Sequence, residues 1–196
     1  MINRLRRRPR EGAGAAAPSQ PVIAPVPSPD QAWKALSLVV DWIKHAETKA
    51  AALLAATGVA GGVLYNLVKN QSDPSRALNI IAGVAGTLLF LAGMFAALAL
   101  KPRLRAKEEP TSSLYYHHIA RKHTRAAGSA VYSQLVLELT SDGEKLVNEV
   151  ATQIWANAHV ASEKYRWINL SMAMFLSALP FLSGVAVVIT MGWNHG

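Results

Sequence analysis

The chain has 196 residues, of which 51% are hydrophobic, 16% charged and only 7% aromatic, and its formal net charge is +8. This excess of apolar residues is unusual for a soluble domain and predicts a membrane protein. The sequence contains no cysteine, which excludes disulfides, zinc-thiolate sites and thiol nucleophiles.

Residues 1–29 are predicted to form a disordered basic leader. Six prolines lie within residues 9–29 among Ala, Ser and Gln, and this composition buries too little apolar surface to offset the entropy of an ordered chain. The basic start MINRLRRRPR is followed by this polar stretch instead of an apolar core, so we expect no cleaved signal peptide.

A helix of about 40 residues is predicted next. Ser28 stands at the N-cap position, Pro29 suits the first helical position, and Gln31 completes a capping box. Apolar residues then recur at helical spacing, at Leu36, Val39, Val40 and Ile43, and no helix breaker follows. Residues 30–49 are therefore expected to form a cytoplasmic helix that continues into a first membrane span at residues 50–68.

Three segments lack Asp, Glu, Lys and Arg: residues 50–68, 77–100 and 168–192. Each is long enough to cross a hydrocarbon core of about 30 Å at about 1.5 Å per residue. Gly58 and Gly62 in the first segment form a GxxxG pair, whose small residues predict a helix-packing face. No ionisable side chain lies inside a span, so a transport pathway through one chain is not favoured.

Residues 101–167 are expected to form a cytoplasmic helical region. Ser141 and Glu144 stand in capping-box positions before a helix that merges with the third span. The histidine cluster His117, His118 and His123 has Tyr, Arg and Lys neighbours instead of carboxylates, which favours a polar bundle surface over a metal site. The predicted fold class is an all-α membrane protein with three transmembrane helices and a small cytoplasmic bundle, two long helices being continuous across the interface.

The distribution of basic residues predicts the orientation. Residues 1–47 hold seven Lys and Arg and residues 101–167 hold ten, whereas the connection at 69–76 holds two and the tail after 192 holds none. The positive-inside rule then places the N-terminus in the cytoplasm and the C-terminus outside the inner membrane. Contact with anionic headgroups also explains the net charge better than binding of polymeric nucleic acid does.

Two segments together carry a resemblance to a known family. AETKAAALLAATGVAGG (46–62), a second span, a helical segment and then QIWANAHVASEKYRWINLSMAMF (153–175) resemble the transmembrane effectors of Pycsar, the pyrimidine cyclase system for antiphage resistance. The matching residues are Glu47, Lys49, Ala50, Lys164 and Tyr165, and the similarity covers about residues 35–188. Glu47 stands where Asp is common in that family.

The resemblance implies a non-enzymatic effector that is activated by a cyclic pyrimidine nucleotide, cCMP or cUMP, and that disrupts the membrane and causes cell death. A partner nucleotide cyclase would supply the activating ligand, and no cofactor is expected. The absence of GxSxG, P-loop and HExxH motifs agrees with a protein that is not an enzyme. Three spans are too few to line a pore, so a homo-oligomer in the lipid bilayer is expected. The alternative is a constitutive membrane scaffold that recruits a cytoplasmic protein.

Lys49 and Lys164 each precede a span and have two interpretations. Lysines at this depth are ordinary interfacial anchors that extend to headgroups, but together with Tyr165 they also suit a shared ligand or switch site. Glu47 favours the second interpretation, because a carboxylate at that depth is costly unless it is paired. We therefore predict a polar cluster of Glu47, Lys49 and Lys164 at the cytoplasmic interface.

Overall fold

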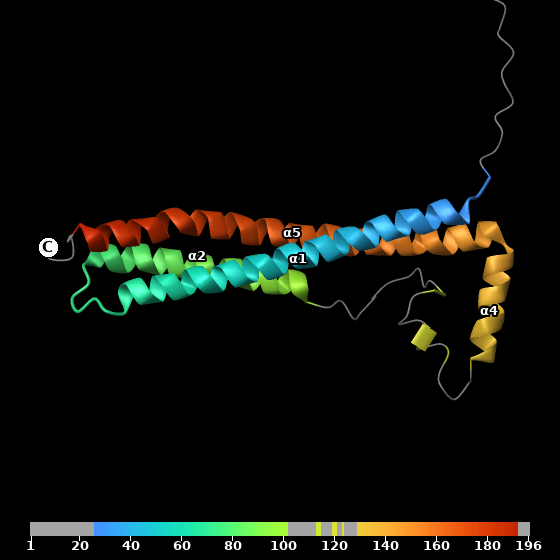
Figure 1. Ribbon diagram of the computed structural model, residues 1–196, viewed down its shortest axis with the longest axis horizontal. Helices are drawn as coiled ribbons and strands as arrows, with labels where there is room; N and C mark the ends of the chain where they lie inside the picture. The colour runs from blue at the N-terminus through green and yellow to red at the C-terminus, as the bar shows by residue number, and fades with distance from the viewer. Residues whose placement is uncertain (1–25, 102–112, 115–118, 121–122, 124–128, 192–196) are drawn as a thin grey trace, which may run out of the picture.

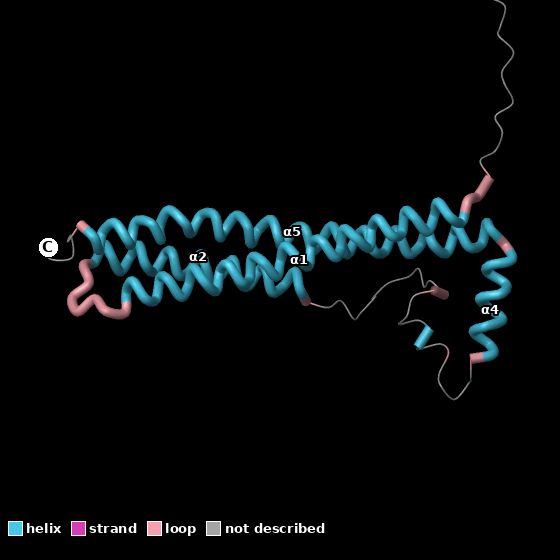
Figure 2. Tube along the Cα trace, viewed as in Figure 1, coloured by secondary structure: helices cyan, strands magenta, loops and turns pink. Residues whose placement is uncertain are grey.

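The fold is all-helical over the residues that the computed structural model describes, which are 26–101, 113–114, 119–120, 123 and 129–191. Four helices are present in this part of the chain: α1 (Pro29–Val68), α2 (Arg76–Leu100), α4 (Ala130–Ser141) and α5 (Gly143–Thr190). No strand occurs among the same residues (Figure 2). Three of the helices, α1, α2 and α5, are long and apolar enough to cross a membrane, which confirms the predicted fold class.

The helices form one elongated rod (Figure 1). Helices α1 and α5 run side by side along most of its length, and α2 joins them over one half. The loop between α1 and α2 lies at the same end as the end of α5, while α4 crosses the opposite end. Helix α2 is therefore antiparallel to its two neighbours, and only α1 and α5 extend beyond the three-helix part.

The buried positions follow a coiled-coil spacing. In α1 they are separated by steps of three, four or seven residues: Leu36, Val39, Ala46, Ala50, Leu53, Thr57, Ala60 and Leu64. The buried set of α2 follows the same steps and is mostly alanine: Leu78, Ala85, Leu89, Ala92, Ala96 and Ala99. A mean repeat of 3.5 residues keeps one seam of each helix facing its partners, and small seam residues let the backbones approach closely.

The two long helices begin differently from one another. Ser28 and Pro29 occupy the predicted N-cap and first helical positions of α1, but the Ser28 side chain makes no capping hydrogen bond. The predicted capping box at Ser141 is wrong, because Ser141 ends α4 and α5 begins at Gly143. The Asp142 carboxylate instead accepts hydrogen bonds from the backbone N–H groups of Glu144 and Lys145, both at 3.1 Å. An anionic cap is favoured there because it also interacts with the positive end of the helix dipole.

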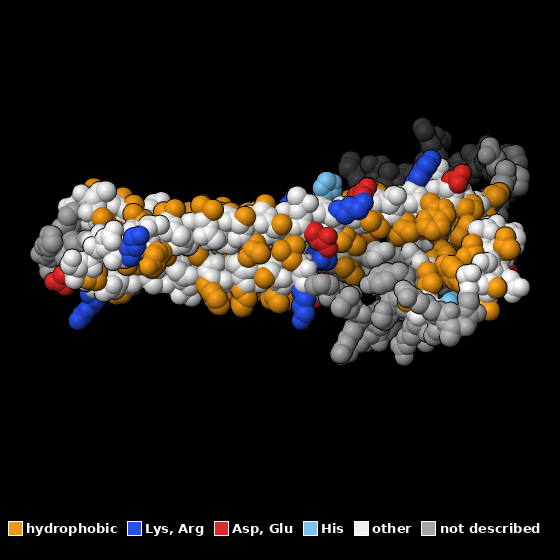
Figure 3. Space-filling view, turned by 60° about the horizontal axis from the view of Figure 1, so that its bottom comes forward, with side chains coloured by type: hydrophobic (Ala, Val, Ile, Leu, Met, Phe, Trp, Pro, Cys, Tyr) orange, Lys and Arg blue, Asp and Glu red, His pale blue; other side chains and the backbone are white. Residues whose placement is uncertain are grey.

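Charged side chains are unevenly distributed along the rod. In Figure 3 they appear at one end of the rod and from its middle toward the other end, and the stretch between is largely free of charged side chains. Many large apolar side chains are exposed in the three-helix half, among them Val59, Val63, Ile80, Phe90 and Leu176. Such a surface suits contact with lipid tails. The predicted cluster members His117 and His118 lie outside the described residues.

Candidate functional site

A buried lysine joins all three long helices at the middle of the rod. The Lys164 ammonium group of α5 donates one hydrogen bond to Glu47 Oε1 of α1 and one to the Ala99 carbonyl oxygen of α2, each at 2.9 Å. The Lys164 side chain is only 7% exposed, whereas that of Glu47 is 48% exposed. We call this set of Glu47, Lys164 and the Ala99 carbonyl the three-helix clasp.

The position of the clasp follows from helix geometry. Helix α2 ends at Leu100, so its last carbonyl groups have no partner further along the helix. Lys164 supplies a donor to one of them and places a positive charge at the negative end of the α2 dipole. The seam places Lys164 there because it lies three residues after the buried Ala161 and four before the buried Ile168. Within the described residues, Lys164 is thus the donor that pairs with this buried carbonyl at the end of α2.

Lys49 does not join the clasp directly. Its ammonium nitrogen lies 5.6 Å from the centroid of the Tyr165 ring, in cation–π geometry, and the side chain is exposed. The four candidate residues thus lie at one level of the rod, where they form two separate pairs. Glu47 pairs with Lys164, and Lys49 lies against Tyr165. Lys164 points inward among the helices and Lys49 points to the surface.

A second buried donor lies one heptad further along α5. The Ser171 hydroxyl is fully buried and donates to the Ala92 carbonyl oxygen of α2 at 2.8 Å. Lys164 and Ser171 are seven residues apart on α5, and their acceptors are seven residues apart on α2. Sequence reasoning missed Ser171, although its place one heptad after Lys164 was the available signal.

The predicted helix-packing glycines do not contact another helix of the same chain. A Cβ added at Gly58 or Gly62 would meet nothing within 4 Å. The close approaches instead involve α2, where a Cβ at Gly86 would lie 3.6 Å from Leu64 Cδ2 and one at Gly93 would lie 3.4 Å from Thr57 Oγ1. The GxxxG pair therefore leaves an open surface on α1.

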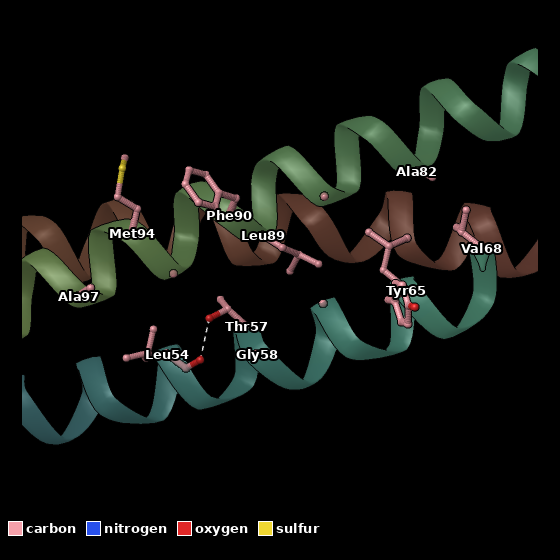
Figure 4. Close-up of a pocket in the computed structure, with 14 residues that line it drawn as sticks. Leu54, Thr57, Gly58, Tyr65, Val68, Ala82, Leu89, Phe90, Met94 and Ala97 are labelled. Atoms are coloured by element: carbon pink, nitrogen blue, oxygen red, sulfur yellow. Dashed lines mark hydrogen bonds between the residues drawn. The ribbon is translucent and has the colours of Figure 1, made fainter.

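Part of this open surface is an apolar groove between α1 and α2 (Figure 4). The groove has a volume of about 800 Å³, and Gly58 and Gly61 of α1 face Gly86 and Gly93 of α2 across it. Apolar side chains complete its walls, among them Leu54, Leu64, Tyr65, Leu89, Phe90 and Met94. Two residues of the α1 wall, Thr57 and Tyr65, carry hydroxyl groups. The Thr57 hydroxyl donates a hydrogen bond to the Leu54 carbonyl oxygen at 2.8 Å. The groove offers shape and apolar contact, and it has no charged lining.

Metal chemistry has little support in the described part of the chain. No group of three His, Asp or Glu side chains that could hold a metal ion occurs there. His123, the described member of the histidine cluster, lies against Tyr132, with ring centroids 5.3 Å apart. The candidate functional site is the charged level of the rod that contains the clasp, where the three-helix half meets the part formed by α1 and α5.

Comparison with known proteins gives a consistent assignment. A family model described as the Pycsar effector protein domain matches residues 31–191. The Pycsar effector protein PtPycTM of Propioniciclava tarda is 32% identical over 170 residues, which cover 86% of this chain and 83% of the relative. The Pycsar effector protein RsPycTM of a Rhizobium species is 24% identical over 161 residues, which cover 79% of this chain and 92% of the relative. No solved structure shows a significant match. The extent of the family match and the identity to PtPycTM show that the chain belongs to the Pycsar effector family.

Proposed function

We propose that this protein is an antiphage effector that responds to a cyclic pyrimidine nucleotide, cCMP or cUMP, by disrupting the inner membrane and killing the infected cell. Family membership supports the role in antiphage defence. The three membrane-spanning candidates support the membrane as the place of action. The nucleotide would come from a pyrimidine nucleotide cyclase, which acts as the functional partner through its product.

The observation that carries the proposal is the three-helix clasp. Helices α1 and α5 are continuous through the level of the clasp. A change in the position of residues 29–48 relative to residues 143–163 would therefore also move the membrane-spanning parts of the same two helices. Lys164 links both helices to the end of α2 at that level. A ligand that favours a different arrangement of these helices would therefore change the packing of all three spans together.

The four candidate residues divide into two roles in this proposal. Lys49 and Tyr165 are on or near the surface and are the members that can meet a ligand phosphate or base. Lys164 already uses two of its donors within the protein, and Glu47 is its partner. We assign Glu47 and Lys164 to coupling between helices and Lys49 and Tyr165 to ligand contact.

The proposal predicts leakage that depends on the nucleotide. Purified full-length protein in dye-filled liposomes is expected to release dye when cCMP or cUMP is added and to release much less with cAMP or without nucleotide. The measurement is the rate of dye release at equal amounts of inserted protein. Equal leakage with and without the pyrimidine nucleotide would contradict the proposal that the nucleotide controls leakage, and it would favour a constitutive membrane protein.

The proposed orientation has its own prediction. With the N-terminus in the cytoplasm and three spans, the C-terminus lies outside the inner membrane. A periplasmic-type reporter such as alkaline phosphatase, fused after Gly196, is expected to be active, and the same reporter fused before Ser28 is expected to be inactive. A cytoplasmic signal at Gly196 would contradict this orientation.

A further inference from the structure

An open cavity lies on the surface of α5 beside the level of the clasp. It has a volume of about 510 Å³ and is lined by Ser162, Tyr165, Arg166, Asn169 and Leu170. These positions are spaced three and four residues apart, so they share one face of the helix. Lys49 of α1 is not part of this lining but lies beside one member of it, since its ammonium nitrogen is 5.6 Å from the centroid of the Tyr165 ring.

The cationic side chains at and beside this cavity pair with no carboxylate of the part of the chain that the structure describes. No Asp or Glu is found among the described residues that line it. Among the residues that the structure describes, neither Lys49 nor Arg166 takes part in an ion pair, and the contacts found for them are those with the Tyr165 and Trp167 rings. The carboxylate nearest in sequence to Lys49, Glu47, is already paired with Lys164. Within the described residues, Arg166 in the cavity and Lys49 beside Tyr165 are therefore two cations without a carboxylate partner.

Two neutral polar residues of the cavity, Asn169 and Ser162, have no side-chain hydrogen bond within the described residues. Asn169 is exposed and lies one residue beyond the buried Ile168, at the start of the apolar part of α5. Within the described residues its amide makes no hydrogen bond, and neither does the Ser162 hydroxyl. A polar amide at the edge of a hydrocarbon layer is costly without a partner. Ser162, Arg166 and Asn169 thus present hydroxyl, guanidinium and amide donors side by side.

We propose that this cavity binds a phosphodiester monoanion through Arg166, Ser162 and Asn169, with Lys49 adding charge. The guanidinium group offers paired N–H donors that match two phosphate oxygens, and the hydroxyl and amide supply further donors. Two sources carry this group at this depth, an anionic phospholipid headgroup and a cyclic mononucleotide. Tyr165 and Leu170 provide apolar contact for the remainder of either molecule. The nucleotide case rests on the proposed function, and the lipid case does not.

The test measures both sources on the full chain. Equilibrium binding of radiolabelled cCMP and cUMP is measured in phosphatidylcholine vesicles, and phosphatidylglycerol retained by the purified protein is counted by native mass spectrometry. Arg166→Gln is expected to weaken binding of either the cyclic nucleotide or phosphatidylglycerol about tenfold, because it removes hydrogen bonds from a charged group. Arg166→Lys keeps the charge without the paired donors and is expected to restore binding only in part. Arg76→Gln, at the exposed start of α2, is the matched control and is expected to change neither.

The outcomes separate this site from the proposed function. Loss of nucleotide binding alone identifies the nucleotide as the source, and loss of phosphatidylglycerol alone identifies the headgroup. If the unaltered protein binds no nucleotide but Arg166→Gln loses lipid, the site stands and nucleotide gating fails. If Arg166→Gln binds both probes as well as the unaltered protein does, the site is refuted, while nucleotide binding by both proteins leaves the proposed function intact.

Discussion

A Lys164→Met variant is expected to lose most of the nucleotide dependence of membrane leakage. Methionine matches the length and apolar stem of lysine, so it fills the buried position without a large cavity. It removes the hydrogen bonds to Glu47 Oε1 and to the Ala99 carbonyl. A hydrogen bond to a charged group contributes about 1.5–3 kcal/mol, and about 1.4 kcal/mol corresponds to tenfold in an equilibrium constant. The ratio of leakage with nucleotide to leakage without it is therefore expected to fall at least about tenfold.

The control for this variant is Lys44→Met. Lys44 forms an ion pair of similar length with Asp41, but both side chains are largely exposed, so that pair contributes little. Its leakage ratio is expected to stay close to that of the unaltered protein. Membrane insertion is quantified in parallel, since the effect on signalling should exceed the effect on insertion. A Lys164→Met protein that inserts normally and keeps the full leakage ratio and phage protection would show that the clasp is only an anchor.

Gly62→Leu is expected to abolish most of the leakage while nucleotide binding is unchanged. Moving a two-state equilibrium from 1:99 to 99:1 requires a differential affinity of about 5.5 kcal/mol, which is large for one monovalent ligand per chain. Several chains that change together add their binding energies. Gly58 and Gly62 leave an open surface on α1 where a second copy can approach closely, and a leucine there would hold the helices apart.

The structure supplies a matched control for this substitution. An added Cβ at Gly62 meets nothing within 4 Å, so leucine is expected to leave the fold of one chain unchanged. Gly83 of α2 is equally open but lies outside the GxxxG pair. The Gly83→Leu variant is therefore expected to release dye from liposomes at the rate of the unaltered protein. Leakage is measured together with oligomeric state by cross-linking in the membrane. Nucleotide-triggered leakage by a strictly monomeric protein would contradict the oligomer.

Helix type and length were predictable from the sequence because they depend on local signals. The long charge-free segments and the Ser28–Pro29 start predicted a first helix of about 40 residues, and α1 has that length. The start of α5 was not predicted, because Ser141 and Asp142 are both good caps and the choice depends on where α4 ends. The exact bounds of the three spans, and the side of the membrane on which the segments between them lie, stay predictions.

The candidate site was only partly accessible to sequence reasoning. The cost of an unpaired carboxylate indicated that Glu47 needs a cation, and the structure places Lys164 against it, 117 positions further along the chain. The third member of the clasp is a backbone carbonyl, which has no side-chain signature in a sequence. The inward direction of Lys164 and the outward direction of Lys49 depend on the 3.5-residue seam, which becomes visible only when all three helices are considered together.

The spacing of the two buried donors of α5 matches one register of α2 against α5. Lys164 and Ser171 are one heptad apart and bind carbonyls one heptad apart on an antiparallel helix, so both bonds belong to a single register. The alanine seam of α2 offers shallow ridges that resist sliding only weakly. A slide by one turn, about 5.4 Å, would break both bonds in the same step. The register of α2 along α5 is therefore defined by two side-chain-to-backbone hydrogen bonds more than by interlocking side chains of its seam.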